Sequence, residues 1–375
     1  MKKTLLVAAL VGVAFTSCVK NEESVSIEKQ QQVTFEPAAY KAGSRAEVAF
    51  PTTEKFGAFA YLSSSTYDHT LFMDNEQVGY FEGINGASSY WATTETTYYW
   101  PESVGSHLDF ICYFPYNADK THAAVPQILD SDGQQTMSYN GFVVDAENPV
   151  DLMYADKAMT QTHNTGNYNN FTGVPTLFHH ALAKLNFKVK TSKLQSIDGQ
   201  TKWSTVVKSI KLDGIRTTGS VTLKTVNDHS KMTLVEWTNT NITTERPYDV
   251  WTTVNTVTTS KEWAFDQTLT VTAEDYQDKV NNFKATEYYV MPQAFIDGAQ
   301  TLTVVYEVTT TTPGGHTGAK EHTTTIDFYD FTNDVKAWEM GKNITYTLQV
   351  DPEGNVIQFA PAVVDWVSID GTIDL

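Results

Sequence analysis

Apolar and polar residues alternate along much of this chain, and a period of two is typical of half-buried β-strands. β-branched and aromatic residues, which suit a pleated sheet, fill the apolar positions. The clearest stretches are 185–190, 221–224, 302–307 and 346–350. Turn-forming sequences separate such runs, namely Asp213-Gly214, Asp297-Gly298, Pro313-Gly314-Gly315 and Asp351-Pro352-Glu353-Gly354. Since no long amphipathic helix is indicated, the pattern predicts an all-β protein built from β-sandwiches.

The length of 375 residues suggests two domains of ordinary size. A loop rich in Asn, Gly and Thr, from Thr162 to Thr176, indicates a boundary near His179. A new strand is expected to begin near Ala183. We therefore expect an N-terminal domain over residues 46–178 and a C-terminal domain over residues 179–355.

The N-terminus has the features of an export signal. Two lysines are followed by an apolar stretch, Leu5 to Phe15, which is too short for a spanning helix. The sequence Thr16-Ser17-Cys18 then resembles a lipobox, although Phe15 stands where Leu is usual. This predicts a signal peptide over 1–17 and a leader over 18–45, with Cys18 carrying the lipid that anchors it. An ordinary secretory signal with an incidental cysteine is the alternative.

Composition narrows the class of protein. Hydrophobic residues make up 41% of the chain and aromatic residues 12%, enough for sizeable cores. The formal net charge is −18, which argues against nucleic acid as a partner. Cys18 and Cys112 are the two cysteines, so a lipidated Cys18 leaves no disulfide within one chain. Cys112 lies in an apolar run and is expected to be buried.

Two segments, expected to lie outside the body of the fold, share one pattern. The first is Val33-Thr34-Phe35-Glu36-Pro37-Ala38-Ala39, and the second is Ile357-Gln358-Phe359-Ala360-Pro361-Ala362-Val363. They correspond without a gap, although seven residues can also match by chance. If the match is meaningful, each segment could add to the same kind of sheet with alternate side chains inserted. These side chains are Val33, Phe35 and Pro37 in the first segment and Ile357, Phe359, Pro361 and Val363 in the second.

The first segment is joined to the rest of the chain by a small, flexible sequence, Ala42-Gly43-Ser44-Arg45-Ala46. Such sites are prone to proteolysis. An arginine-specific protease that cut between Arg45 and Ala46 would release the leading strand together with the lipid. An ordinary surface arginine in a linker is an equal alternative.

Several blocks, taken in order along nearly the whole chain, resemble the fimbrillin family of type V pilus subunits. They are the lipobox, 44–46, 56–61, 98–101, 110–115, 151–155, 178–185, 289–293, 338–342 and 365–366. The resemblance implies two transthyretin-like β-sandwich domains in tandem. It also implies an outer-membrane lipoprotein whose first strand is cleaved away after Arg45.

In this family the vacated position accepts the C-terminal strand of another pilin subunit. Residues 356–375, including Trp366, match that donor extension. The resemblance thus implies a cell-surface fimbrium that supports adhesion, without a cofactor and without enzymatic activity.

Catalytic motifs such as His-Glu-x-x-His, Gly-x-Ser-x-Gly and Cys-x-x-Cys are missing from the sequence. His179 and His180 are adjacent, so a strand would point them to opposite faces. Asp130-Ser131-Asp132-Gly133 reads as a turn rather than a calcium loop. Tyr98, Tyr99 and Trp100 fit half-buried strand residues better than a sugar platform. The main alternative is therefore a surface lipoprotein that binds glycans without polymerising, and a hydrolase is a weaker third.

Overall fold

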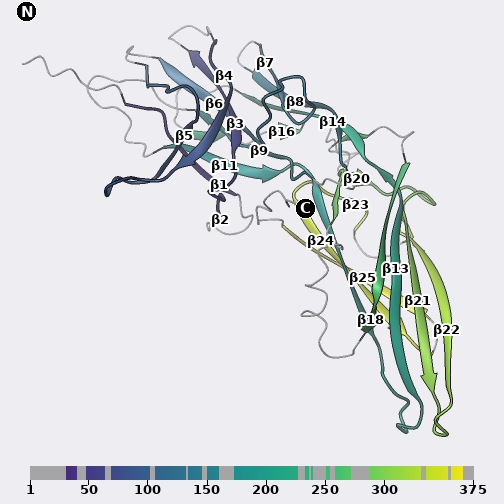
Figure 1. The fold of residues 1–375 in the computed structure, drawn as a ribbon. Helices are drawn as coiled ribbons and strands as arrows, with labels where there is room; N and C mark the ends of the chain where they lie inside the picture. The colour runs from purple at the N-terminus through teal and green to yellow at the C-terminus, as the bar shows by residue number, and fades with distance from the viewer. Residues whose placement is uncertain are drawn as a thin grey trace, which may run out of the picture.

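The structure is a computed structural model. It describes residues 31–39, 48–63, 69–101, 106–131, 134–145, 150–159, 173–226, 233–235, 238–239, 251–253, 258–271, 288–330, 335–353 and 356–365. All regular elements in these ranges are β-strands (Figure 1). Within them, no helix is long and apolar enough to cross a membrane.

The N-terminal half is built on one large sheet that closes on itself. The strand order is β15-β10-β6-β3-β4-β5-β1-β11-β9, and β9 also pairs with β6, so the strands from β6 to β9 form a closed barrel. β2 pairs with the end of β1. The strands are β1 Phe35–Ala39, β2 Val48–Ala49, β3 Phe56–Ser63, β4 Thr70–Phe81, β5 Tyr90–Thr93, β6 His107–Phe114, β9 Met153–Ala155, β10 Lys157–Met159, β11 Val174–His180 and β15 Thr233–Val235.

A second sheet covers one side of this barrel. Its order is β16-β14-β8-β7, with β17 also on β14. The strands are β7 Gln127–Ser131, β8 Gln134–Val143, β14 Thr218–Val226, β16 Thr238–Asn239 and β17 Thr252–Thr253. One buried cluster fills the barrel, and a second lies between the barrel wall and this sheet. β6 separates the two clusters, which explains why all its residues are buried.

Cys112 shows how this arrangement decides the role of single residues. It faces the barrel interior with Phe110 and Phe114, whereas Ile111 and Tyr113 face the second cluster. Its thiol is free and buried, and burial raises its pKa well above the ordinary value. The expectation that Cys112 is buried is confirmed.

The C-terminal half is a sandwich of two four-stranded sheets. Their orders are β19-β12-β24-β25 and β18-β13-β21-β22, and β20 and β23 form a separate pair. The strands are β12 Ala183–Thr191, β13 Lys202–Arg216, β18 Thr258–Val271, β19 Tyr288–Val290, β20 Gln293–Ala294, β21 Thr301–Thr311, β22 Thr317–Asp327, β23 Ala337–Trp338, β24 Lys342–Asp351 and β25 Val356–Asp365. One buried cluster fills the space between the sheets.

The alternation found in the sequence accounts for this core. Leu302, Val304 and Tyr306 are fully buried on β21, and their neighbours are partly exposed. The same alternation holds for Phe187 and Val189 on β12, which are buried between partly exposed neighbours. The predicted all-β fold with sandwich packing is confirmed by these layers.

Strand pairing does not follow a simple division at residue 178. His179 and His180 still belong to β11 in the barrel, and the C-terminal sandwich begins with β12 at Ala183. β14, which follows β13 in the sequence, returns to pair with β8. Part of the segment 179–355 therefore completes the N-terminal half, because an antiparallel partner for β8 is supplied from beyond the expected boundary.

The connections between strands show which strands run toward the junction between the two halves and which run away from it. β11 leads straight from the barrel into β12, so its end marks the junction between the halves. β12 and β24 are parallel, so both run away from this junction, and β25 returns toward it. Figure 1 shows the barrel half and the long C-terminal sheets following one another along an elongated molecule. The turn between β24 and β25 thus lies at the far end of the C-terminal sandwich.

Candidate functional site

The first described strand, β1, is one stave of the barrel. It runs parallel to β11 over its whole length, from Phe35 opposite Val174 to Ala39 opposite Phe178. On its other side it pairs with β5 through Phe35 and Trp91. The backbone N–H of Val174 also donates to the carbonyl of Thr34 at 2.7 Å. We call the place between β5 and β11 that β1 fills the β1 slot.

Side chains from this segment form part of the barrel core. Val33 is 1% exposed and Phe35 2% exposed. The Phe35 ring meets Phe56 and Phe110 edge to face, with ring centroids 5.6 Å and 5.7 Å away. Glu36 lies on the outside and is exposed, as alternation requires. The segment therefore contributes to the barrel as a buried strand and not as a surface tail.

The backbone just before β1 is held by another strand-like segment. The N–H of Val33 donates to the carbonyl of Tyr98, and the N–H of Trp100 donates to the carbonyl of Gln31, both at 2.9 Å. Gln32 and Tyr99 form the antiparallel bridge between these two bonds. The leader thus pairs with the barrel over a longer stretch than β1 itself, and this stretch includes Gln31.

Gly173 permits the close approach of β11 to β1. A Cβ atom at this position would lie 2.7 Å from the carbonyl carbon of Phe35 and 2.9 Å from its oxygen. Both atoms belong to the backbone, so they cannot move aside by a rotamer change. Any side chain at residue 173 therefore competes with the strand in the slot.

We expect Gly173→Ala to destabilise the uncleaved chain by about 1–3 kcal/mol, because a methyl group is forced into a filled contact. Thermal unfolding and the rate of proteolysis at the leader would both report the loss. Gly318→Ala is the matched control, since nothing lies within 4 Å of its Cβ position and its backbone needs no left-handed conformation. Equal stability of the two variants would show that the contact at Gly173 is not needed.

The closing segment is also built into a sheet. β25 pairs with β24 in its own chain, with Phe359 registered opposite Leu348 and Pro361 opposite Tyr346. Ile357 packs against the C-terminal core, whereas Val363 is partly exposed. Among the described strands, β25 pairs with β24 alone, at the edge of its sheet. The expectation that both matching segments lie outside the body of the fold is therefore wrong.

Some residues singled out in the sequence lie outside the described residues. These are Cys18, Arg45, Ala46 and Trp366. The position of Arg45 in the sequence is still informative, because it falls between β1 and β2.

The two adjacent histidines point to opposite faces of β11, as predicted. His180 Nδ1 lies 2.8 Å from Asp151 Oδ1, and His179 Nε2 lies 2.9 Å from Asp156 Oδ1. Each ring is thus held by its own carboxylate. In the described part of the chain, no group of His, Cys, Asp and Glu side chains is arranged to hold a metal ion.

A buried ion pair is a polar feature that no motif in the sequence indicates. Lys157 Nζ on β10 lies 3.3 Å from Asp109 Oδ2 on β6, and both side chains are fully buried. Burial lowers the pKa of Lys157, and the charge of Asp109 opposes that shift. Only the pairing of β10 with β6 brings the two residues together, so no local signal could have revealed them.

The aromatic run at Tyr98 does not form a flat exposed platform. Tyr98 packs against Phe72, and its hydroxyl donates to Glu76 Oε1 at 2.7 Å. Burial raises the pKa of Tyr98 to about 12, with Glu76 adding to the shift, so the hydroxyl stays protonated. Trp100 contacts the barrel core edge to face through Phe110. Of the three, Tyr99 is the most exposed, at 44%.

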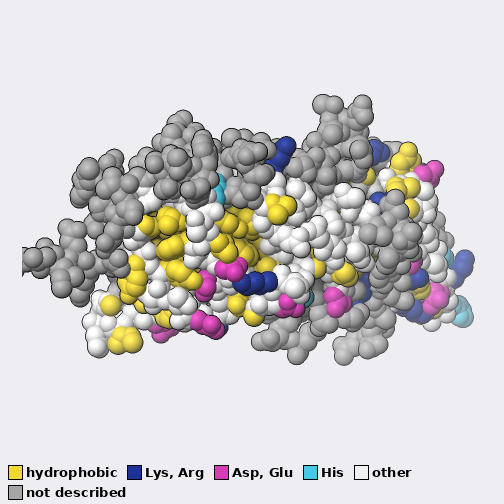
Figure 2. Space-filling model, turned by 90° about the horizontal axis from the view of Figure 1, so that it is seen from above, with side chains coloured by type: hydrophobic (Ala, Val, Ile, Leu, Met, Phe, Trp, Pro, Cys, Tyr) yellow, Lys and Arg dark blue, Asp and Glu magenta, His cyan; other side chains and the backbone are white. Residues whose placement is uncertain are grey.

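Exposed hydrophobic side chains do occur on this half of the molecule. Figure 2 shows hydrophobic side chains on one face of the barrel half, with charged side chains beside them. The exposed large ones here include Leu71, Ile84, Tyr90 and Tyr99. They are spread over several strands and loops.

Comparison with known proteins adds the family. The family model described as fimbrillin-like matches residues 44–366. Among solved structures, a fimbrial protein from Bacteroides vulgatus is 19% identical, with a TM-score of 0.48, covering 90% of this chain and 100% of the other. A candidate cell adhesion protein from Bacteroides uniformis is 17% identical, with a TM-score of 0.41, covering 89% and 98%. No curated protein gives a significant match. The match over most of its length shows that this chain belongs to the fimbrillin-like family.

Proposed function

We propose that this protein is a structural subunit of a type V-like fimbria that polymerises by strand exchange. It is exported as a lipoprotein on Cys18, cut after Arg45 by an arginine-specific protease, and joined to other pilin subunits at the cell surface. Cell adhesion is the role that such a filament supports. Membership of the fimbrillin-like family favours this structural role over catalysis.

One observation carries the proposal: β1 is one strand of the barrel wall, but a single linker joins it to the rest of the chain. Val33 and Phe35 lie in the core, and Arg45 stands between β1 and β2. One cut after Arg45 leaves β1 held by non-covalent contacts only. Loss of β1 would open the barrel between β5 and β11, exposing both apolar core and unpaired backbone groups.

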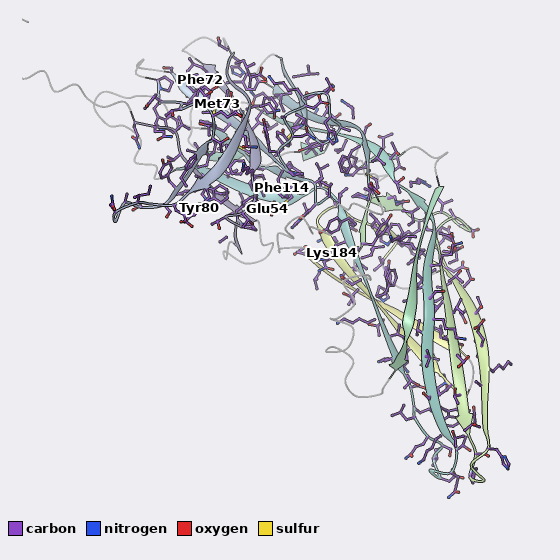
Figure 3. All side chains as sticks on the ribbon, in the orientation of Figure 1. Glu54, Phe72, Met73, Tyr80, Phe114 and Lys184 are labelled. Atoms are coloured by element: carbon purple, nitrogen blue, oxygen red, sulfur yellow. The ribbon has the colours of Figure 1, made fainter. Side chains whose placement is uncertain are left out.

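The direction of β1 suits a linear filament. β1 is parallel to β11, which ends at the junction with the C-terminal sandwich, so β1 begins at the opposite end of the barrel. Phe72 and Met73 lie toward that outer end, and Tyr80 and Phe114 lie nearer Lys184 at the junction (Figure 3). A donor strand that ran in the same direction as β1 would enter the barrel at this outer end. The subunit that supplies the strand would therefore lie beyond the outer end of the barrel.

The donor segment starts from the other end of the molecule. The turn between Asp351 and Val356 lies far from the junction, because β24 runs away from it. A tail released from β24 would extend beyond this end and could reach the barrel of the next subunit. Contacts between two such unlike ends repeat without closing, which produces an open filament.

The free energy of exchange is the gain from filling the β1 slot less the cost of releasing β25 from β24. Each apolar side chain buried by the donor contributes about 1.5–3 kcal/mol, and each main-chain hydrogen bond about 1 kcal/mol net. While β1 occupies the slot, an incoming tail gains none of this. Cleavage is therefore what converts an inert precursor into a subunit able to polymerise.

The test uses the purified full chain treated with an arginine-specific protease. On a gel, cleaved chains are expected to form a ladder of oligomers that resists mild heating in detergent. Untreated chains are expected to stay monomeric. Mass spectrometry would identify the new N-terminus, expected at Ala46. Cleaved protein that stays monomeric after long incubation would overturn the proposal.

A variant lacking residues 356–375 provides the complementary arm. It should be cleaved normally but should form no ladder, because it has no donor strand. A lipoprotein that binds glycans without polymerising would form no ladder with or without residues 356–375. Comparing the full chain with the shortened chain therefore separates the two functions.

A further inference from the structure

The segment Tyr98–Trp100 would lose its backbone partner together with the leader. In the uncleaved chain it binds Gln31 and Val33 through two hydrogen bonds. Both of these residues precede Arg45, so departure of the cleaved leader frees the N–H of Trp100 and the carbonyl of Tyr98. The inference drawn from this rests on the proposed function, and it concerns where the incoming strand makes its first contacts.

The register places one pair of side chains together on the outside of the barrel. The bonds run from Val33 to Tyr98 and from Trp100 to Gln31, so Gln32 and Tyr99 face each other as a non-hydrogen-bonded pair. In antiparallel strands this kind of pair has the shorter Cα separation and the closer side chains. Tyr99 is 44% exposed, so its ring is available to whatever strand lies opposite.

The alignment of the two matching segments can be extended by one residue toward the N-terminus, which brings in Gln32 and Val356. If Ile357 takes the place of Val33, the preceding residue, Val356, takes the place of Gln32. Aromatic and β-branched side chains on facing strands stabilise each other. A glutamine opposite Tyr99 in the leader would thus be replaced by a valine in the donor.

We propose that Tyr98–Trp100 forms the outer part of the acceptor site, and that Tyr99 recognises Val356 of a second copy of this chain. The donor strand then begins before the seven-residue match. It pairs first with Tyr98–Trp100 in antiparallel fashion and then with β11 in parallel fashion. Tyr99 acts as a positioning residue that favours the donor over the leader.

The surroundings favour a strand over a sugar as the occupant. A sugar platform needs several ring faces open to solvent, but Tyr98 and Trp100 pack inward against Phe72 and Phe110. The groups left unsatisfied after cleavage are one N–H and one carbonyl at the spacing of a strand ladder. Backbone pairing by an added strand satisfies both.

The test is a double-mutant cycle in the full chain after cleavage. Tyr99→Ser and Val356→Gln are each expected to slow ladder formation roughly two- to fivefold. The double variant should be no slower than either single variant, because the two residues act through one contact. Tyr329→Ser, which alters a tyrosine 48% exposed, is the matched control and should assemble at the normal rate.

The outcomes also separate this inference from the proposed function. Normal assembly of Tyr99→Ser, or purely additive effects in the double variant, would overturn the contact while leaving strand exchange intact. If the unsubstituted chain fails to assemble after cleavage, strand exchange itself is refuted and this contact with it. Thermal unfolding of the uncleaved variants checks that each one folds.

Discussion

A cleaved chain carrying Phe359→Asp is expected to form no detergent-resistant ladder. In the donor strand, Phe359 would take the place of Phe35, which is 2% exposed between two phenylalanine rings. An aspartate there must either be buried as an unpaired charge or be protonated at neutral pH, and both cost several kcal/mol. Gel analysis of cleaved protein, with and without heating in detergent, measures the effect.

The matched control for this variant is Val364→Asp. Val364 lies one residue beyond the matching segment and is 59% exposed on β25, so a charge there is tolerated in the resident sheet. Ladders should form with this variant. If Phe359→Asp also assembles normally, the closing strand does not enter the β1 slot with Phe359 in the place of Phe35. Circular dichroism of both uncleaved variants would establish that the fold is retained.

Cells producing Arg45→Ala are expected to display no filaments and to retain the protein at its precursor size. Without the cut, β1 stays tethered beside the barrel at a very high effective concentration, so a neighbour's tail cannot compete. Immunoblotting gives the size of the surface protein, and electron microscopy of whole cells shows whether filaments form. Normal filaments from this variant would refute Arg45 as the cut site.

A rescue distinguishes failed cleavage from a folding defect. The recognition sequence of an unrelated protease can be placed in the linker of the Arg45→Ala chain. Adding that protease to purified protein should restore ladders to the level of the unsubstituted chain. Continued absence of ladders after complete cleavage would mean that Arg45 matters for some reason other than proteolysis.

The local pattern of the sequence was sufficient for the elements of the sheets. Alternation predicted β12, β14, β21 and β24, because one buried face imposes a period of two that is visible in any short window. The same reasoning predicted that Cys112 would be buried and that the two histidines would diverge. The match between residues 33–39 and 357–363 was also visible in the sequence alone, as a repeated pattern of side chains.

What the sequence could not supply was the choice of partners. Alternation does not reveal that β1 lies beside β11, that β14 returns to β8, or that Asp109 meets Lys157. Those pairings join residues far apart in the chain, and each depends on the register of a whole sheet. The segments expected outside the fold proved to be strands within it, because each finds its partner only when distant strands are in place.

The sequence by itself determined the class of structure, the family resemblance and the two matching strands, since these depend on local periodicity and residue order. The tertiary structure alone decided that β1 closes a barrel, that Gly173 admits its backbone, and that Tyr98–Trp100 holds the leader before it. The physical reason is that the local sequence of a strand does not show whether the strand belongs to a closed barrel. It becomes part of one only when strands from both sides, remote in sequence, supply the hydrogen bonds and the apolar surface that bury it.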